Sequence, residues 1–575
     1  MIKFRFMTLH SYTLLRIKHA SIIPFCLFLF LMIFIPRSLN AQAVYEPVDN
    51  NLVYELLDEL AALKVITINS VVKPYSRVFI AGKLREALRN TKKLSKRQAE
   101  EIRLYLKDYQ FESGLSNNLV NGLMTPDTNH LVPDHPPPVF SYDPIAVGYS
   151  GNLFRIRALP WIGGRFLLNE NGNVREFNGG GEVYGYLGKH IGYYASVKYT
   201  WESEPMVNPV IFTLEEGKSW NYKGNGSVEN TELRGGISVG WKWGEFGLFK
   251  DRPVWGNAKH GSNIMSGHPP SFPFIQLHLK PAKWIEFYSI TGFLKSNVID
   301  SSRSSFEQGS VSIKYHKKYF SANFITITPW KGLDFSIGNS IFWSDAFKVA
   351  YLIPFNLYKS VDETTKGSLA YADGINTNDD GHLFVDISTR NIKHIQLYLG
   401  WWIDDWVSSY LLDPKLHNAF GWKLGVNIYD LPVKNLLLTI EGSINRPRIY
   451  QEYIPAHTYA NDEYNFGNYL RDDSWELYIC AIYKPLRGLN ISASYNIAQH
   501  GGFQYMKDDY TTYPLAKNLI FNQTVFELYS SYRLLSNVYV FIGYINTRHA
   551  GDVQFIPQVF HGNTNTLSLG ILAGF

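Results

Sequence analysis

The stretch from Lys250 to Pro273 gathers residue types that suit sugar binding. Trp255 offers a flat apolar face on which a pyranose ring can stack. Its polar companions could hydrogen-bond to sugar hydroxyl groups, and they are Asp251, Ser262, Asn263 and Ser266. Lys259 could meet a uronate or phosphate substituent. The competing interpretation is structural, with Trp255 as an interfacial aromatic residue and the glycines of the stretch permitting tight turns.

A second candidate surface ends a stretch of alternating apolar and polar residues. Trp401, Trp402 and Trp406, together with the carboxylate of Asp404, resemble a carbohydrate platform. Asp404 and Asp405 are neighbours on a predicted strand, so their side chains point to opposite faces and do not form an acid–base pair. The alternative is an aromatic girdle at the strand end.

Linear motifs give no support for catalysis or for metal binding. The sixteen histidines show no H-E-x-x-H spacing, and no glycine pattern indicates nucleotide binding. Asn376, Asn378, Asp380 and Gly381 match the first half of a calcium loop, but Ile387 stands where that loop requires glutamate. We therefore expect a polar surface turn there, and no cofactor, metal or catalytic residue. An enzyme assembled from separate strands would leave no linear motif and stays open as an alternative.

Residues 1–43 are predicted to be a cleaved secretory signal peptide. Basic residues precede an apolar run over residues 22–35, and Ala41-Gln42-Ala43 supplies a cleavage site. The run is shorter than the roughly 20 residues of a membrane-spanning helix, although an uncleaved anchor is the alternative. Cys26 follows a poor lipoprotein signal, so no lipid anchor is expected.

Charge and cysteine content limit the partners and the covalent cross-links that this protein is expected to have. The predicted signal peptide holds five basic residues and no acidic one, so the remaining chain has 50 basic and 50 acidic residues and no net charge. This balance gives no indication of a nucleic-acid partner. Cys480 would be the only remaining cysteine, which excludes an intrachain disulfide. The aromatic content of 15% suits barrel girdles or sugar-stacking surfaces.

The C-terminal residues from Leu567 to Phe575 predict the closing strand of a transmembrane β-barrel. Apolar side chains alternate with small or polar ones up to a terminal aromatic residue. A last strand of this kind pairs with the first strand so that no edge faces lipid. We expect Phe575 to be read by the barrel-assembly machinery of a Gram-negative-type outer membrane.

Similar alternation recurs from about residue 144 onward, as in the segment from Leu233 to Trp243. Tight turns alternate with long connections, which is typical of outer-membrane barrels. Residues 144–575 are therefore predicted to form an antiparallel barrel of about 18 strands in contact with outer-membrane lipid. A soluble β-sandwich or propeller also alternates, but explains neither the signal peptide nor the turn asymmetry.

Residues 44–115 read as short amphipathic helices. One is expected over residues 52–66, a second from near Ser76, and a third from Ser95, where Ser95 and Gln98 form a capping-box pattern. A bundle of this size has a thin core, so we expect it to lean on the barrel at its periplasmic mouth. The proline-rich residues 116–143 are predicted to be a linker.

Two short stretches resemble the Wzi-like capsule-assembly proteins of the outer membrane. The first carries Lys250-Asp251, Trp255-Gly256, Gly261-Ser262, Ser266 and Pro273, and the second is Lys73-Pro74-Tyr75-Ser76-Arg77. The resemblance implies a lectin-like barrel of about 18 strands that holds capsular polysaccharide at the cell surface. Asn257-Ala258-Lys259 departs from the tryptophan- and glycine-richer form of the family loop.

Three functions follow from these patterns. The first is a non-enzymatic outer-membrane protein that binds capsular or other extracellular polysaccharide for capsule assembly or attachment. The alternative is a porin or solute channel, which requires an open lumen with a charged constriction. A barrel-embedded hydrolase is the third, and it requires a catalytic pair at the outer rim.

Overall fold

The computed structural model describes residues 43–49, 51–113, 139–143, 146–151, 153–307, 310–362, 379–413, 415–504, 507–535 and 538–574. Most of the predicted signal peptide over residues 1–43 and of the predicted linker over residues 116–143 lies outside the described residues. The same holds for Asn376, Asn378 and Phe575.

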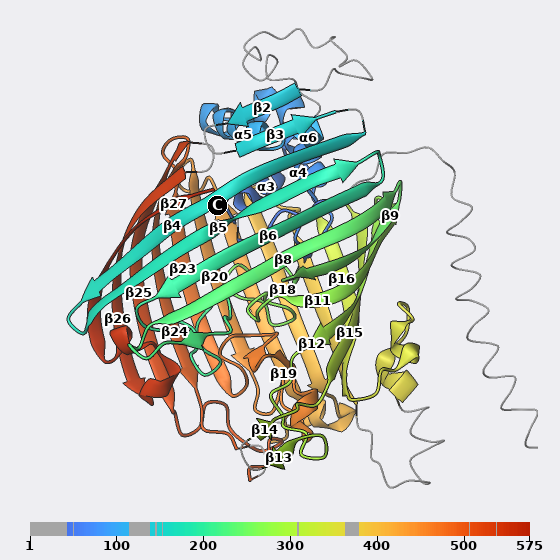
Figure 1. The fold of residues 1–575 in the computed structure, drawn as a ribbon, viewed down its shortest axis with the longest axis vertical. Coiled ribbons are helices and arrows are strands. Elements are labelled where there is room, and N and C mark those ends of the chain that lie inside the picture. The colour runs from blue at the N-terminus through green and yellow to red at the C-terminus, as the bar shows by residue number, and fades with distance from the viewer. Residues whose placement is uncertain are drawn as a thin grey trace, which may run out of the picture. The chain divides into compact units, whose positions relative to one another are not determined.

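Within the described residues, eighteen antiparallel strands form one closed barrel (Figure 1). They are β4 (Phe154–Asn169), β5 (Gly172–Leu187), β6 (Ile191–Glu202), β8 (Val228–Trp241), β9 (Gly244–Asp251), β11 (Phe272–Ala282), β12 (Ile285–Leu294), β15 (Lys318–Trp330), β16 (Leu333–Ser344), β17 (Asp380–Thr389), β18 (Ile395–Asp405), β19 (Ala419–Tyr429), β20 (Leu436–Asn445), β23 (Ser474–Tyr483), β24 (Leu489–His500), β25 (Phe521–Leu535), β26 (Val538–Gly551) and β27 (Asn563–Ala573). Strand β27 pairs with β4 from Leu567↔Leu168 to Ala573↔Ile162. The predicted fold class and the pairing of the last strand with the first are therefore confirmed.

The barrel is apolar outside and polar inside, as alternation requires. On β27, Leu569 and Ile571 are 40% and 51% exposed, whereas Thr566 and Ser568, which precede them, are buried. A soluble protein buries its large apolar residues instead. An outer surface of this kind matches the lipid-facing band of a transmembrane barrel.

The strand connections differ between the two ends of the barrel. At one end, called here the short-turn end, β8 joins β9 through residues 242–243 and β11 joins β12 through residues 283–284. At the other, the long-loop end, residues 203–227, 252–271 and 446–473 connect consecutive barrel strands. Short turns face the periplasm in outer-membrane barrels, so the long loops correspond to the cell-surface side.

In the part of the chain that the structure describes, four α-helices precede the barrel: α3 (Asn51–Ala62), α4 (Arg77–Arg89), α5 (Lys96–Asp108) and α6 (Gln110–Ser113). Ser76 caps α4 by accepting a hydrogen bond from the amide of Phe79. Ser95 and Gln98 form the capping box predicted for α5. None of the helices in the described part of the chain has the length and hydropathy of a membrane span.

The helices lie against the short-turn end of the barrel (Figure 1). The backbone amide of His394, between β17 and β18, donates to the carbonyl of Ala62 at 3.1 Å. Lys484 pairs with Glu55 at 3.1 Å, and Arg533 pairs with Asp108 at 2.6 Å. These contacts fix the helical region on several different strand connections.

Short elements complete the described chain. The hairpin of β2 (Val139–Asp143) and β3 (Ala146–Ser150) extends the sheet beside the first half of β4. The remaining strands are β1 (Val72–Lys73), β7 (Asn221–Tyr222), β10 (Val254–Trp255), β13 (Ser305–Glu307), β14 (Ser310–Ser312), β21 (Ala460–Asn461) and β22 (Tyr464–Asn465). The 3₁₀ helices are η1 (Thr91–Lys93), η2 (Val349–Leu352), η3 (Ser408–Leu412), η4 (Pro455–His457), η5 (Val553–Phe555) and η6 (Gln558–Phe560).

Candidate functional site

The predicted sugar-binding loop folds into the barrel. Residues 252–271, called here the plug loop, connect β9 to β11 and contain β10, which pairs with β1 of the N-terminal region through Val72↔Trp255. The amide of Gly256 donates to the carbonyl of Val71 at 3.0 Å. The plug loop therefore lies in the lumen and joins the N-terminal region to the wall.

Trp255 is fully buried, with 0% of its surface exposed. Its ring stacks on Phe324 of β15, with centroids 5.2 Å apart and planes 5° apart, and packs edge-to-face on Phe384 of β17. Trp255 therefore has a packing role inside the lumen and is not the interfacial aromatic residue of the structural alternative. Saccharide stacking on this indole would require the plug loop to move.

The predicted polar candidates at the end of β9 and in the plug loop bond to the protein itself. Asp251 accepts a hydrogen bond from the hydroxyl of Tyr194 at 2.5 Å, and Ser262 donates to the carbonyl of Trp255 at 2.6 Å. The side-chain amide of Asn263 donates to two wall carbonyls, both at 3.2 Å. Ser266 donates to the carbonyl of Phe466 at 2.9 Å. These polar groups hold the plug loop in place.

Lys259 forms an ion pair with Asp58 of α3, which also pairs with Arg390 at 3.1 Å. Burial alone would raise the pKa of the Asp58 carboxyl, but Lys259, Lys73 and Arg390 outweigh it and hold that pKa well below its usual range. The plug loop is thus locked to α3 by charge as well as by hydrogen bonds. The Lys259 ammonium group predicted to meet an anionic sugar already has a carboxylate partner.

The tryptophan run of β18 divides between the two faces of the wall. Trp401 points outward and stacks on Trp422, with centroids 4.6 Å apart and planes 8° apart. Trp406 packs beside Trp401 and is half exposed. This outer cluster at the long-loop end has the form of an aromatic girdle.

Trp402 and Asp404 point the other way, into the lumen. Trp402 is fully buried and stacks on Phe384, with planes 6° apart. Asp404 accepts a hydrogen bond from the amide of Tyr450 at 2.9 Å, which ties β18 to the loop over residues 446–473. The four predicted residues of this run therefore belong to two separate environments.

A crevice of about 540 Å³ lies at the long-loop end, and we call it the rim crevice. It is lined among others by Asn221, Glu229, Lys250, Phe293, Lys295 and Asn461. Phe293 and Lys295, at the end of β12, are exposed. Sequence reasoning missed them because the crevice forms only where β8, β9 and β12 meet segments from residues 219–221 and 461. The only feature of the sequence that indicated a surface site there was the clustering of long strand connections at this end of the barrel.

A larger cavity, of about 770 Å³, lies inside the barrel, and we call it the lumen cavity. Asp108 and Tyr109 line it near the short-turn end, and Ile556 and Phe560 line it at the long-loop end. Many of its walls are charged, as in the pair of Arg165 with Glu176 and Glu215. The cavity runs along the wall strands on the far side from the plug loop's contacts with β17 to β20.

Residues 236–240 read Gly-Ile-Ser-Val-Gly and match the G-x-S-x-G pattern of serine nucleophiles. They lie inside β8 rather than on a strand-to-helix turn. The hydroxyl of Ser238 is buried and donates to the carbonyl of Ala43 at 2.6 Å. This environment favours a structural role for Ser238.

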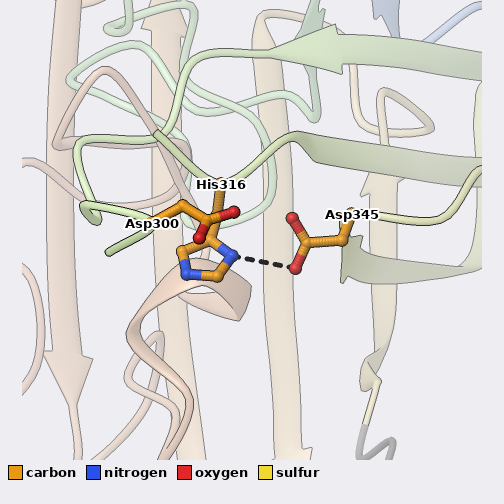
Figure 2. A group of neighbouring side chains, drawn as sticks. All are labelled: Asp300, His316 and Asp345. Carbon is orange, nitrogen blue, oxygen red and sulfur yellow. Dashed lines mark hydrogen bonds and ion pairs between the residues drawn. The ribbon is translucent and has the colours of Figure 1, made fainter. Parts of the chain in front are cut away.

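Two groups of side chains have the composition of metal ligands within the described residues: Asp300, His316 and Asp345, and Asp380, His382 and Asp404. Figure 2 shows the first, where His316 contacts Asp345 at 2.8 Å. Arg303 forms ion pairs with both Asp300 and Asp345, so a cation already neutralises this group. It is a surface ion-pair cluster.

Comparison with known proteins finds similarity in three-dimensional structure. Wzi of Escherichia coli, described as a carbohydrate-binding β-barrel of the outer membrane involved in group 1 capsule assembly, aligns with a TM-score of 0.53 and 12% identity. The alignment covers 93% of this chain and all of that one. The chain is similar in fold to Wzi.

Two other structures are similar over less of the chain. OccD3 (OpdP) of Pseudomonas aeruginosa aligns over 72% of this chain and 90% of its own, with a TM-score of 0.39 and 10% identity. OpdK of the same organism, determined with vanillate, aligns over 73% and 98%, with a TM-score of 0.41 and 6% identity. No family model and no curated protein matches the sequence.

Proposed function

We propose that this protein is a non-enzymatic, lectin-like barrel of the outer membrane that binds capsular or other extracellular polysaccharide at the cell surface. The observation that carries the proposal is the contrast between a lumen crossed by the plug loop and a polar, partly aromatic crevice at the long-loop end. The Wzi-like fold, which in Wzi itself is described as carbohydrate-binding, supports it. The apolar outer face would contact outer-membrane lipid, and a cleaved signal peptide and Phe575 would direct export and assembly.

The rim crevice has the chemistry that saccharides need. The exposed ring of Phe293 supplies an apolar face for a sugar ring, and Asn221 and Glu229 supply groups that bond to hydroxyls. Lys295, held at 3.2 Å from Asp462, could exchange that partner for a uronate. One such site binds weakly, but a polymer presents many repeats to many protein copies, so multivalency retains it.

The test is binding of purified protein to immobilised capsular polysaccharide from the same cells. We expect Phe293→Ala and Lys295→Ala each to weaken binding about fivefold, equivalent to roughly 1 kcal/mol. The matched controls are Trp330→Ala and Lys331→Ala, which remove exposed side chains of the same kinds at the short-turn end. Trp401→Ala tests the tryptophan candidate separately.

Equal binding by the crevice variants and the controls would remove the rim crevice from the proposal. Failure of the wild type to bind any surface polysaccharide would refute the proposal itself. A deletion strain gives the cellular counterpart, since loss of attachment should release polymer into the medium at unchanged total yield.

A solute channel is the second candidate, because the lumen cavity reaches from the helices to the loop after β26. Its charged walls would suit a small polar solute. If the protein is a channel, it should give stable conductance in planar bilayers. If it is a lectin-like barrel, it should give no stable conductance.

A further inference from the structure

Two acidic residues and a histidine meet on the lumen face of adjacent strands. Asp380 and His382 lie on β17, and Asp404 lies on β18. Next to the paired residues Leu383 and Ile403, His382 and Asp404 occupy the adjacent positions of the two antiparallel strands. In the sequence, Asp380 belongs to a stretch that matches the first half of a calcium loop, and Asp404 belongs to the predicted sugar platform. The fold brings these two stretches together.

Their ligand atoms converge on one point. The Nε2 atom of His382 lies 2.9 Å from Oδ2 of Asp380 and 4.0 Å from Oδ2 of Asp404, and one ligand atom from each residue falls within 4.8 Å of the others. Adjacent ligands of a tetrahedral ion with bond lengths of about 2.1 Å lie roughly 3.4 Å apart. The distances of 2.9 Å and 4.0 Å lie on either side of this value, so small shifts of the side chains would let all three atoms contact one ion.

Two of the three ligand atoms have no partner outside the cluster. His382 is 2% exposed and Asp380 is 6% exposed, and apart from the 2.9 Å contact between them, Nε2 of His382 and Oδ2 of Asp380 make no hydrogen bond to any other described residue. Buried polar atoms are normally satisfied, because an unmet group costs about 1–3 kcal/mol. Both atoms instead point to a shared space beside Asp404.

Surrounding contacts hold the three side chains in this orientation. Nδ1 of His382 lies 3.4 Å from the hydroxyl of Ser340, its direct partner on β16, which leaves Nε2 free to face Asp404. The amide of Tyr450 fixes Asp404. The rings of Trp402 and Tyr459 pack against the imidazole, with centroids 4.8 and 5.1 Å away. Such outer contacts orient the ligands of metal sites and exclude water from them.

We propose that Asp380, His382 and Asp404 bind a divalent transition-metal ion, with Zn²⁺ as the best fit. One neutral imidazole and two carboxylates neutralise a dication, and nitrogen–oxygen sets of this kind suit Zn²⁺ better than Ca²⁺. Lys318 interacts electrostatically with Asp380, but its ammonium group donates to the carbonyl of Thr458 at 2.6 Å and forms no ion pair within 4.0 Å among the described residues. The bound ion would fasten β17 and β18 to the loop over residues 446–473.

The cluster of Figure 2 is the matched control. It has the same three residue types, but Arg303 pairs with both of its carboxylates and its groups are more exposed. If residue type alone were enough to bind zinc, both the buried cluster and the surface cluster of Figure 2 would bind it. Our proposal predicts that only the buried one does.

The experiment uses the full chain, purified in detergent without a polyhistidine tag, stripped with EDTA and dialysed against Zn²⁺. We expect about one zinc per protein by mass spectrometry of the metal, and a lower unfolding temperature after EDTA. His382→Gln and Asp404→Asn should each lose most of the zinc, and His316→Gln should keep it. Heat-modifiable migration on gels checks that each variant forms a barrel.

Three results would overturn the proposal. The first is a wild-type protein that retains no zinc after dialysis, which requires no variant to fold. The second is zinc retained by both His382→Gln and Asp404→Asn. The third is zinc lost from His316→Gln, which would place binding at the surface cluster.

Discussion

At the scale of single residues, Trp255 supports the plug loop through packing. The indole fills the space between Phe324 and Phe384 and is completely buried. Replacing a buried tryptophan by alanine leaves a cavity and typically costs 3–5 kcal/mol. We expect Trp255→Ala to lower the free energy of unfolding by about that amount, measured by urea unfolding in detergent.

Trp406→Ala is the control for this substitution. Trp406 is half exposed at the outer rim, so its loss should cost less than about 1 kcal/mol. Unchanged stability of Trp255→Ala together with weaker polysaccharide binding would restore the sugar-stacking interpretation of Trp255.

The residue types of the plug loop were readable from the sequence, but their partners were not. Asp251, Ser262 and Asn263 suit hydroxyl recognition, and they equally suit the Tyr194 hydroxyl and backbone carbonyls that they contact. A sequence specifies what a side chain can bond to, whereas the partner follows from which segments meet in the lumen.

At the scale of elements, two loops of the long-loop end meet at a pair of buried carboxylates. Asp473 accepts hydrogen bonds from the amides of Ala516 and Phe503, and Asp472 accepts one from the amide of Arg448. Burial raises the pKa of Asp472 to about 6 and that of Asp473 to about 7. Both values lie above the ordinary 3.8, so the folded loops favour the protonated carboxyls.

The stability that the folded loops gain from holding Asp472 and Asp473 in the protonated form is complete below pH 3.8. It is lost as the pH rises through 6 and 7. We expect hydrogen exchange at residues 446–451, 503 and 516, corrected for intrinsic rates, to indicate easier local opening at pH 8 than at pH 5. Asp473→Asn, which cannot ionise, should flatten much of this dependence, while Asp509→Asn on the exposed surface should not. Faster corrected exchange at the lower pH would contradict the sign.

Elements with regular periods were predictable, and irregular ones were not. Period-2 alternation marks strands and their faces because one face of each is apolar, and the Ser95–Gln98 box marks the start of α5. On β16, however, Asn339 faces outward and bonds to a covering segment through the amide of Tyr358. The segment that contains Tyr358 has no regular alternation of apolar and polar residues. Its position against the outer face of the wall therefore could not be predicted from the sequence.

At the scale of the whole molecule, closure of the barrel and filling of its lumen are separate properties. Closure follows from strand number and the pairing of β27 with β4, both predictable from alternation and turn spacing. An 18-stranded barrel is wide enough for an aqueous channel unless something fills it. Here the plug loop does so, through Asn257 on Asp386, His260 on Glu441 and Lys423 on the carbonyl of His260.

This filling predicts a low conductance in planar bilayers and a specific way to raise it. Replacing residues 257–265 with a short Gly-Ser linker removes the contacts to Asp386 and Glu441, so steady conductance should rise several-fold. The matched control replaces residues 408–411, a mostly exposed segment of the loop after β18, and should leave the conductance low. Stable porin-like conductance by the intact protein would contradict a filled lumen and favour transport through the lumen cavity. An unchanged low conductance after plug-loop replacement would show instead that the N-terminal helices seal the short-turn end by themselves.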